Sequence, residues 1–154
     1  MTRAHVGLGS NLGDRTGMLR DAIRRLSSFV RIDAASDVYD SEPWGWTDQP
    51  RFLNMAVRGR TRLDPEALLR AVKEVERGLG RTETVRMGPR VIDIDVLLYG
   101  GLSLEQDDLV IPHPGLLDRA FVLVPLLEID AELVHPVNGV PLSTALQPLR
   151  DAAS

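Results

Sequence analysis

The feature that most constrains the fold is the alternation of residue types in residues 91–99, just after Gly88-Pro89-Arg90. Alternate residues of a β-strand point to opposite faces of a sheet. The even positions Ile92, Ile94, Val96 and Leu98 therefore predict one apolar face. Asp93 and Asp95 stand together on the opposite face. One side of this strand is expected to pack in a core, and the other side carries two carboxylates.

The two carboxylates admit two interpretations. Because they are two residues apart on one strand, the carboxylates lie about 6.5 Å apart. Such a like-charged pair is unfavourable unless it is solvated or neutralised. An isolated Asp-x-Asp pattern favours two solvated acids. Here Gly88-Pro89 forces a turn before the strand, and the guanidinium of Arg90 suits phosphate oxygens. These neighbours favour a hard divalent cation, and magnesium fits because it takes one or two carboxylates together with water and substrate phosphates.

Length, charge and cysteine content limit the class of protein. The 154 residues predict a single domain over residues 1–154. A net charge of -4 argues against nucleic acid or an anionic membrane as the main partner. The chain has no cysteine, no apolar leader and no apolar run long enough to span a bilayer. We therefore expect a cytoplasmic, monomeric protein. Any anionic ligand would be bound by a local group of positive charges, since the chain as a whole is acidic.

The rest of the chain predicts an α+β fold. Strands are expected over residues 3–9, 30–39 and 52–57, with helices over residues 17–26 and after Asp64-Pro65. Together with the aspartate strand this order is the ferredoxin-like βαββαβ sandwich, whose helices cover one face of the sheet. The residues expected on the uncovered face are Gly7, Gly9, Phe52, Asn54, Asp93 and Asp95. A C-terminal extension follows, with a short edge strand at 109–111, a mostly apolar helical segment at 121–129 and a weak last helix within 133–149.

Three local patterns leave alternatives open or are rejected. The run from Gly7 to Arg15 has neither the third glycine of a dinucleotide fingerprint nor the Gly-Lys-Ser/Thr of a P-loop. Trp44 and Trp46 share a loop rich in Gly and Pro, which suits a lid or stacking surface and core packing about equally. His113, between two prolines, could bond phosphate or cap a backbone carbonyl, and taken alone the pattern favours the cap.

Five blocks, in order along nearly the whole chain, resemble the signatures of the 6-hydroxymethyl-7,8-dihydropterin pyrophosphokinase family. They are Gly9-Ser10-Asn11-Leu12-Gly13-Asp14, Ser41-Glu42-Pro43-Trp44-Gly45, Phe52-Leu53-Asn54, Gly88-Pro89-Arg90-x-x-Asp93-x-Asp95 and Pro112-His113. The resemblance implies transfer of the β,γ-diphosphate of ATP to the pterin hydroxymethyl group, a step of folate biosynthesis. It also implies ATP as co-substrate, two magnesium ions and a ferredoxin-like fold.

The resemblance also implies residue roles. Asp93 and Asp95 would hold both ions, and Arg81 and Arg90 would bind the transferring phosphates. The positions expected on the nucleotide side are Glu76, His113 and Arg119. Those expected around the pterin are Ser41, Trp44 and Asn54, with Phe52 and Phe121 stacking on its two faces.

The chain departs from the family pattern at four positions. Met87 stands where relatives often have Trp, and Thr82, Glu83 and Asp108 stand where some have basic residues. These changes bear on loop closure and ATP affinity and not on the reaction itself, because the metal pair and both principal arginines are present. Two competing functions remain at this point, a ferredoxin-like nucleic-acid-binding module and a magnesium-dependent phosphotransferase acting on another heterocycle. The acidic sheet face argues against the first.

Overall fold

The computed structural model describes residues 1–41, 50–80 and 91–153 and shows an α+β fold. Along the chain its elements are β1 (Thr2–Ser10), α1 (Arg15–Leu26), β2 (Arg31–Ala35), β3 (Tyr39–Ser41), β4 (Phe52–Thr61), α2 (Pro65–Gly78), β5 (Asp93–Tyr99), β6 (Leu104–Gln106), β7 (Leu109–Ile111), α3 (Ala120–Ile129) and α4 (Ser143–Ala153). No described helix is both long enough and apolar enough to cross a membrane.

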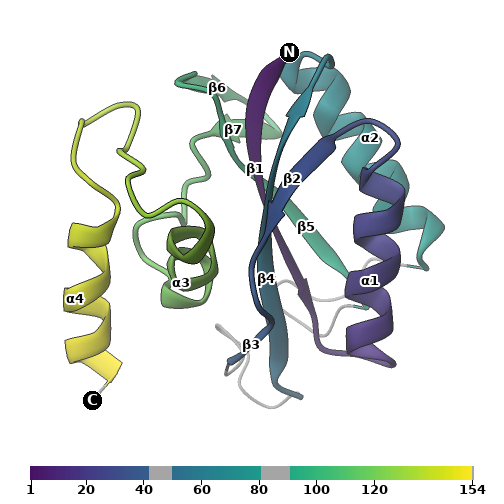
Figure 1. The fold of residues 1–154 in the computed structure, drawn as a ribbon, viewed down its shortest axis with the longest axis horizontal. Helices are drawn as coiled ribbons and strands as arrows, with labels where there is room; N and C mark the ends of the chain where they lie inside the picture. The colour runs from purple at the N-terminus through teal and green to yellow at the C-terminus, as the bar shows by residue number, and fades with distance from the viewer. Residues whose placement is uncertain (42–49, 81–90, 154) are drawn as a thin grey trace.

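The central sheet has the strand order β2-β4-β1-β5, and β3 pairs with β4 beside β2 (Figure 1). All of these pairs are antiparallel. The strand predicted over residues 30–39 is therefore two short strands, since the chain leaves the ladder between Ala35 and Tyr39. β6 and β7 form a separate hairpin. Because β1 and β4 are central, their side chains meet packing partners on both faces of the sheet.

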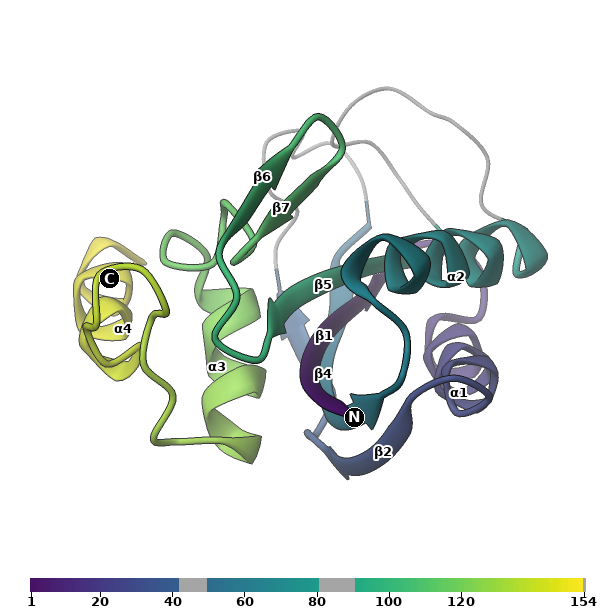
Figure 2. The same ribbon diagram turned by 90° about the horizontal axis from the view of Figure 1, so that it is seen from above.

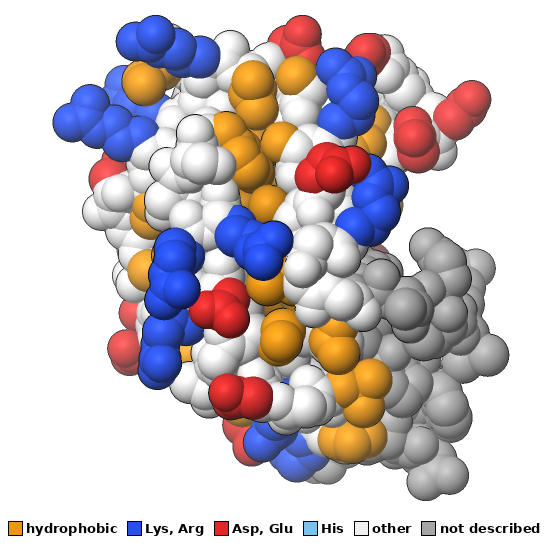
Figure 3. Space-filling view, turned by 90° about the vertical axis from the view of Figure 1, so that its right-hand side faces the viewer, with side chains coloured by type: hydrophobic (Ala, Val, Ile, Leu, Met, Phe, Trp, Pro, Cys, Tyr) orange, Lys and Arg blue, Asp and Glu red, His pale blue; other side chains and the backbone are white. Residues whose placement is uncertain are grey.

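Helices α1 and α2 cover one face of the sheet, as predicted (Figure 2). Each begins at an aspartate, because Asp14 accepts a hydrogen bond from the Gly17 amide at 3.1 Å and Asp64 accepts one from the Ala67 amide at 2.8 Å. The apolar residues buried beneath them include Leu19, Ala22, Leu26, Leu68, Val72 and Val75. Figure 3 shows the outer side of this layer, where charged side chains flank a narrow apolar strip.

The prediction that helices cover only one face is wrong. Helix α3 packs against the other face, on β4 and β1, and α4 packs on the outside of α3 (Figure 1). A second buried cluster fills this layer and comprises Ala56, Leu97, Leu98, Leu116, Leu123, Leu126 and Leu142. The segment 121–129 is apolar on most sides, so burial between the sheet and α4 stabilises it more than packing on one side would. Near the start of β5, Asp93 and Asp95 stay partly exposed among the described residues of this face.

The face predicted for Leu98 is also wrong. In the pairing of β1 with β5, His5 lies opposite Leu98 and Val6 lies opposite Val96, so the register shifts by one residue at Leu97. This extra residue is a β-bulge, which reverses the side-chain alternation beyond it. Ile94 and Val96 consequently face α1 and α2, whereas Leu97 and Leu98 both join the cluster beneath α3.

Candidate active site

The acidic pair lies on the open part of the second sheet face. Asp93 and Asp95 of β5 stand opposite Gly9 and Gly7 of β1. Directly opposed residues of an antiparallel pair point to the same face, which confirms the predicted grouping of these four positions. Glycine adds no side chain at positions 7 and 9, and the space that a Cβ would take is already bordered by Leu97 beside Gly7 and by Asn54 and Phe52 beside Gly9. Both aspartates are partly exposed, and the side chain of Asp95 is 39% exposed.

A row of opposed residues connects the acidic pair with a polar site on β4. Asp93, Gly9, Asn54 and Tyr39 face one another in turn across β5, β1, β4 and β3. The Asn54 side chain is buried, with 6% of the residue exposed, and its amide nitrogen donates to the Ser41 hydroxyl at 2.5 Å. Phe52, opposite Ser41, continues the same face. The sheet therefore presents carboxylates at one end of this row and a buried amide with an aromatic neighbour at the other.

His113 closes the acidic end, and the carbonyl-cap interpretation of it is wrong. Its Nδ1 accepts a hydrogen bond from the Gly115 amide at 3.0 Å, and its Nε2 lies 3.8 Å from Oδ1 of Asp95. Burial lowers the pKa of His113, and the positive charge of Arg119 lowers it further, while Asp93 opposes the shift. The ring is therefore neutral at pH 7 with its proton on Nε2, available for donation toward the acidic end.

Glu76 acts through the backbone of β5 in this structure. It is 4% exposed on α2, and its carboxylate accepts a hydrogen bond from the Ile94 amide at 2.8 Å. Ile94 lies between Asp93 and Asp95, so this contact fixes the strand that carries the acidic pair. A carboxylate in the buried stripe of α2, four residues after Val72, needs such a partner. Its predicted contact with the nucleotide stays a prediction.

Comparison with known proteins places these features in a family. The family model described as 7,8-dihydro-6-hydroxymethylpterin-pyrophosphokinase matches residues 5–131. The chain belongs to this family. The 2-amino-4-hydroxy-6-hydroxymethyldihydropteridine pyrophosphokinase of Methylorubrum extorquens is 48% identical over 151 residues, which are 97% of this chain and 94% of the relative. The Aquifex aeolicus enzyme of the same name is 43% identical over 142 residues, 92% of this chain and 89% of the relative.

A solved structure supports the fold of the pyrophosphokinase family member described here. Plasmodium falciparum HPPK-DHPS, in a triple mutant with pterin and p-hydrobenzoate, aligns with a TM-score of 0.79 at 15% identity. The alignment covers 99% of this chain and 45% of the longer Plasmodium chain. At this identity the likeness concerns the fold alone.

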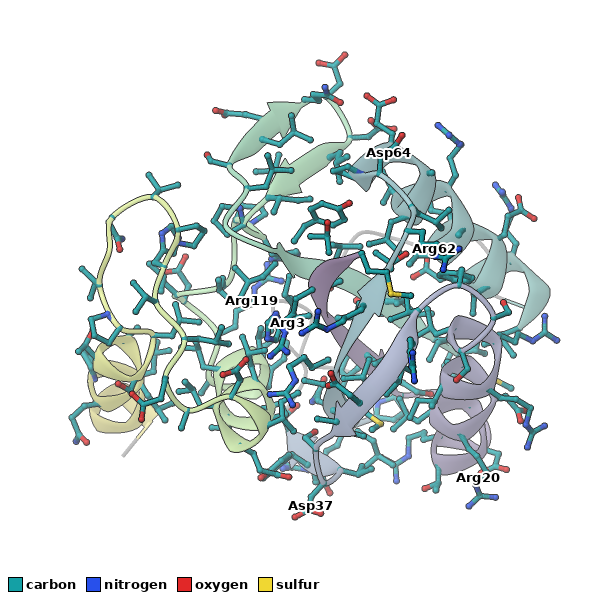
Figure 4. All side chains as sticks on the ribbon, turned by 45° about the horizontal axis from the view of Figure 1, so that its top comes forward. Arg3, Arg20, Asp37, Arg62, Asp64 and Arg119 are labelled. Carbon is teal, nitrogen blue, oxygen red and sulfur yellow. The ribbon has the colours of Figure 1, made fainter. Side chains whose placement is uncertain are left out.

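The described part of the chain brings together most residues predicted for a pyrophosphokinase site. Ser41, Phe52, Asn54, Asp93, Asp95 and His113 share one face or its rim. Arg119, labelled in Figure 4, lies just before α3, and its positive charge lowers the pKa of His113. Phe121 is partly buried in the first turn of α3. The predictions for Trp44, Arg81 and Arg90 concern positions outside the described residues, as do those for Thr82, Glu83 and Met87.

The chemistry of the donor set fits magnesium. Two carboxylates on one open sheet face supply hard oxygen ligands of the kind magnesium prefers. Among residues 1–41, 50–80 and 91–153, no group of three or more His, Cys, Asp or Glu side chains could hold a metal. A two-carboxylate site leaves coordination positions for water and for phosphate oxygens of a nucleotide.

The sequence interpretation missed two side chains beside this site, Tyr39 and Glu128. Tyr39 lies in the row opposite Asn54, and its hydroxyl donates to the Glu128 carboxylate of α3. The available signal was weak, since Glu128 is the one charged residue in the apolar run 120–129. Only the packing of α3 on the second face puts it beside β3.

Proposed function

We propose that this chain catalyses transfer of the β,γ-diphosphate of ATP to 6-hydroxymethyl-7,8-dihydropterin, with AMP and the pterin diphosphate as products, in folate biosynthesis. The observation that carries the proposal is the cross-strand row from Asp93 through Gly9 to Asn54. It offers a site for a metal-bound polyphosphate and, two strands away on the same face, a buried amide for a heterocycle. Family membership and relatives at 43% and 48% identity support the same reaction.

At the polyphosphate end, Asp93 and Asp95 would hold two magnesium ions. Bound magnesium neutralises phosphate charge. His113 presents an Nε2–H beside Asp95, suited to a phosphate oxygen. The positive charge of Arg119 favours an anionic ligand at this end. Diphosphoryl transfer needs positioning and charge stabilisation more than a protein nucleophile, and Arg81 and Arg90 would add two further cations.

At the pterin end, Asn54 would recognise the ring edge, because a carboxamide both donates and accepts hydrogen bonds. Its amide nitrogen is already bonded to Ser41, which orients the group. Phe52 and Phe121 would stack on the two faces of the ring, with Trp44 at the border. In this arrangement the pterin hydroxymethyl oxygen would attack the β-phosphorus and lose its proton to solvent, and the bond from that phosphorus to the oxygen of the α-phosphate would break to release AMP.

The proposal includes a ferredoxin-like topology for the core of the fold. The order β1, α1, β2, β4, α2, β5 and the antiparallel neighbours β2-β4-β1-β5 support a ferredoxin-like core with a C-terminal extension. Both buried clusters share the central sheet, which supports a single domain over residues 1–154. The monomeric state and cytoplasmic location stay predictions from the sequence.

Mass spectrometry tests the reaction directly. The protein is incubated with ATP, magnesium and the hydroxymethyldihydropterin, and AMP and pterin diphosphate are expected in equal amounts. Omission of magnesium, or of the pterin, should abolish both products. Formation of ADP with a pterin monophosphate, or ATP cleavage independent of the pterin, would refute diphosphoryl transfer.

A further inference from the structure

Glu128 joins helix α3 to the segment that leads into β3. The backbone amide of Asp37 donates to both carboxylate oxygens of Glu128, at 2.9 and 3.2 Å. The Tyr39 hydroxyl donates to one of the same oxygens. Glu128 follows Asp37 by 91 residues in sequence, so the contact belongs to tertiary structure. Asp37 is labelled in Figure 4 where the chain enters β3.

The strand held by Glu128 carries part of the proposed pterin site. β3 has three residues, and in the described part of the chain its one strand partner is β4. Within it, Tyr39 faces Asn54, and Ser41 accepts the hydrogen bond of the Asn54 amide. A three-residue edge strand has few ladder hydrogen bonds of its own. Its position against β4, and with it the orientation of Asn54, therefore depends on contacts from outside the sheet.

Helix α3 also carries Phe121, which is proposed to stack on the face of the pterin ring opposite Phe52. Phe121 precedes Glu128 by seven residues, which is two helical turns, so both side chains lie on one side of α3. The C-terminal end of α3 is also anchored to the sheet, because Arg58 donates to the Ile129 carbonyl at 3.1 Å and His5 Nε2 lies 2.9 Å from Asp130. These contacts fix the position of helix α3 on the sheet, and the hydrogen bonds of Glu128 link β3 to the helix.

We propose that Glu128 is a positioning residue of the pterin pocket, which fixes β3, with Ser41 and through it Asn54, relative to α3 and Phe121. This inference rests on the proposed function, since it assigns Glu128 to the pterin half of that site. In the described part of the chain, Glu128 bonds to Asp37 and Tyr39, both at the pterin end of the proposed site, so its effect should be confined to the pterin.

The placement of Glu128 favours a geometric role over a stabilising one. The residue is exposed, and so are its contacts with Asp37 and Tyr39. Hydrogen bonds in contact with water add little to the free energy of folding. A carboxylate with two acceptor oxygens can nevertheless receive the Asp37 amide and the Tyr39 hydroxyl at once. Its hydrogen bond with Tyr39 raises the pKa of the tyrosine, which keeps the hydroxyl protonated as a donor.

The test compares three single variants and one double variant, Tyr39→Phe with Glu128→Ala, with a matched control. Glu128→Ala removes both acceptors, Glu128→Gln keeps one side-chain oxygen, and Tyr39→Phe removes one donor. Glu132→Ala, an exposed glutamate four residues further on, serves as the control for loss of a surface charge. The readouts are pterin KM and Kd, ATP Kd, kcat and the melting temperature, measured on the full chain.

Glu128→Ala should raise pterin KM and Kd about three- to tenfold, as expected for loss of hydrogen bonds that orient a site. ATP Kd and melting temperature should stay near the wild-type values. Glu128→Gln should recover most of the pterin affinity, and Glu132→Ala should match wild type. Tyr39→Phe combined with Glu128→Ala should be no weaker than Glu128→Ala alone, because both changes break the same contact.

Two outcomes would overturn the inference. One is a Glu128→Ala variant with wild-type pterin affinity, and the other is an equal loss of ATP and pterin affinity, which would indicate general loosening. If Glu128→Ala does not fold, the same criteria apply to Tyr39→Phe, which removes one donor to Glu128. Failure of the proposed function looks different, because the wild-type chain would then form no pterin diphosphate.

Discussion

Substitution of Gly9 by alanine probes the most closely packed point of the candidate site. Gly9 lies between Asn54 and Asp93 in the cross-strand row. A Cβ at this position would lie 3.0 Å from Oδ1 of Asn54 and 3.6 Å from Cδ1 of Phe52. The first distance is shorter than almost all real Cβ contacts, so the Asn54 carbonyl group must move by a few tenths of an ångström.

The expected effect on pterin binding follows from how Asn54 is held. Its amide nitrogen is bonded to Ser41 at 2.5 Å, so the group cannot rotate away from a new methyl without losing that bond. A misaligned buried hydrogen-bonding group costs about 1–2 kcal/mol, which weakens pterin binding about 5- to 30-fold. The free energy of unfolding should change little, because replacing glycine in a strand gains roughly 0.5–1 kcal/mol that offsets the local strain.

Calorimetric titration with the pterin and a thermal melt measure both quantities. Gly101→Ala is the matched control, since a Cβ there would meet no atom within 4 Å and its φ lies outside the left-handed region. The control should bind pterin as wild type does. Unchanged pterin affinity in Gly9→Ala would refute the placement of Asn54 against the pterin, and a large loss of stability would show that position 9 serves packing instead.

Three further perturbations test other parts of the site and fold. Asp95→Asn keeps the size of the side chain but removes its charge, and should lower kcat about 100-fold or more with little change in melting temperature; normal turnover in magnesium would exclude a metal role. Asn54→Leu should weaken pterin binding and leave ATP binding nearly intact by titration, whereas equal loss of both would indicate a structural residue. Burial lowers the pKa of His5 in the folded protein despite the opposing effect of Asp130. As the pH falls below about 6.5, the unfolded chain therefore takes up the proton first, and the free energy of unfolding should fall by at most about 1.4 kcal/mol per pH unit for this residue. Urea unfolding of His5→Gln at several pH values should show a flatter pH dependence than wild type, and an unchanged slope would assign the effect to another group.

The sequence by itself determined the elements whose signals are local. Alternation in residues 92–96 is enough to assign the face of Asp93 and Asp95, since side-chain direction in a strand depends only on backbone geometry. Asp64 likewise marks the start of α2, because a capping side chain bonds amides two or three residues away. The first helix begins at Arg15, two residues before its predicted start at residue 17. The shared face of Gly9, Asn54 and Asp93 followed from parity in three separate strands.

Tertiary structure alone decided the features that depend on distant segments. The bulge at Leu97 places Leu98 under α3, and no alternation rule within β5 predicts where an extra residue enters the ladder. His113 lies beside Asp95 of β5, and Glu128 accepts from Asp37 just before β3; both contacts join segments at separations that local patterns do not encode. Coverage of the second sheet face by α3 results from competition among apolar surfaces of the whole chain, because hydrophobic burial is non-directional and selects a partner only once all layers are assembled.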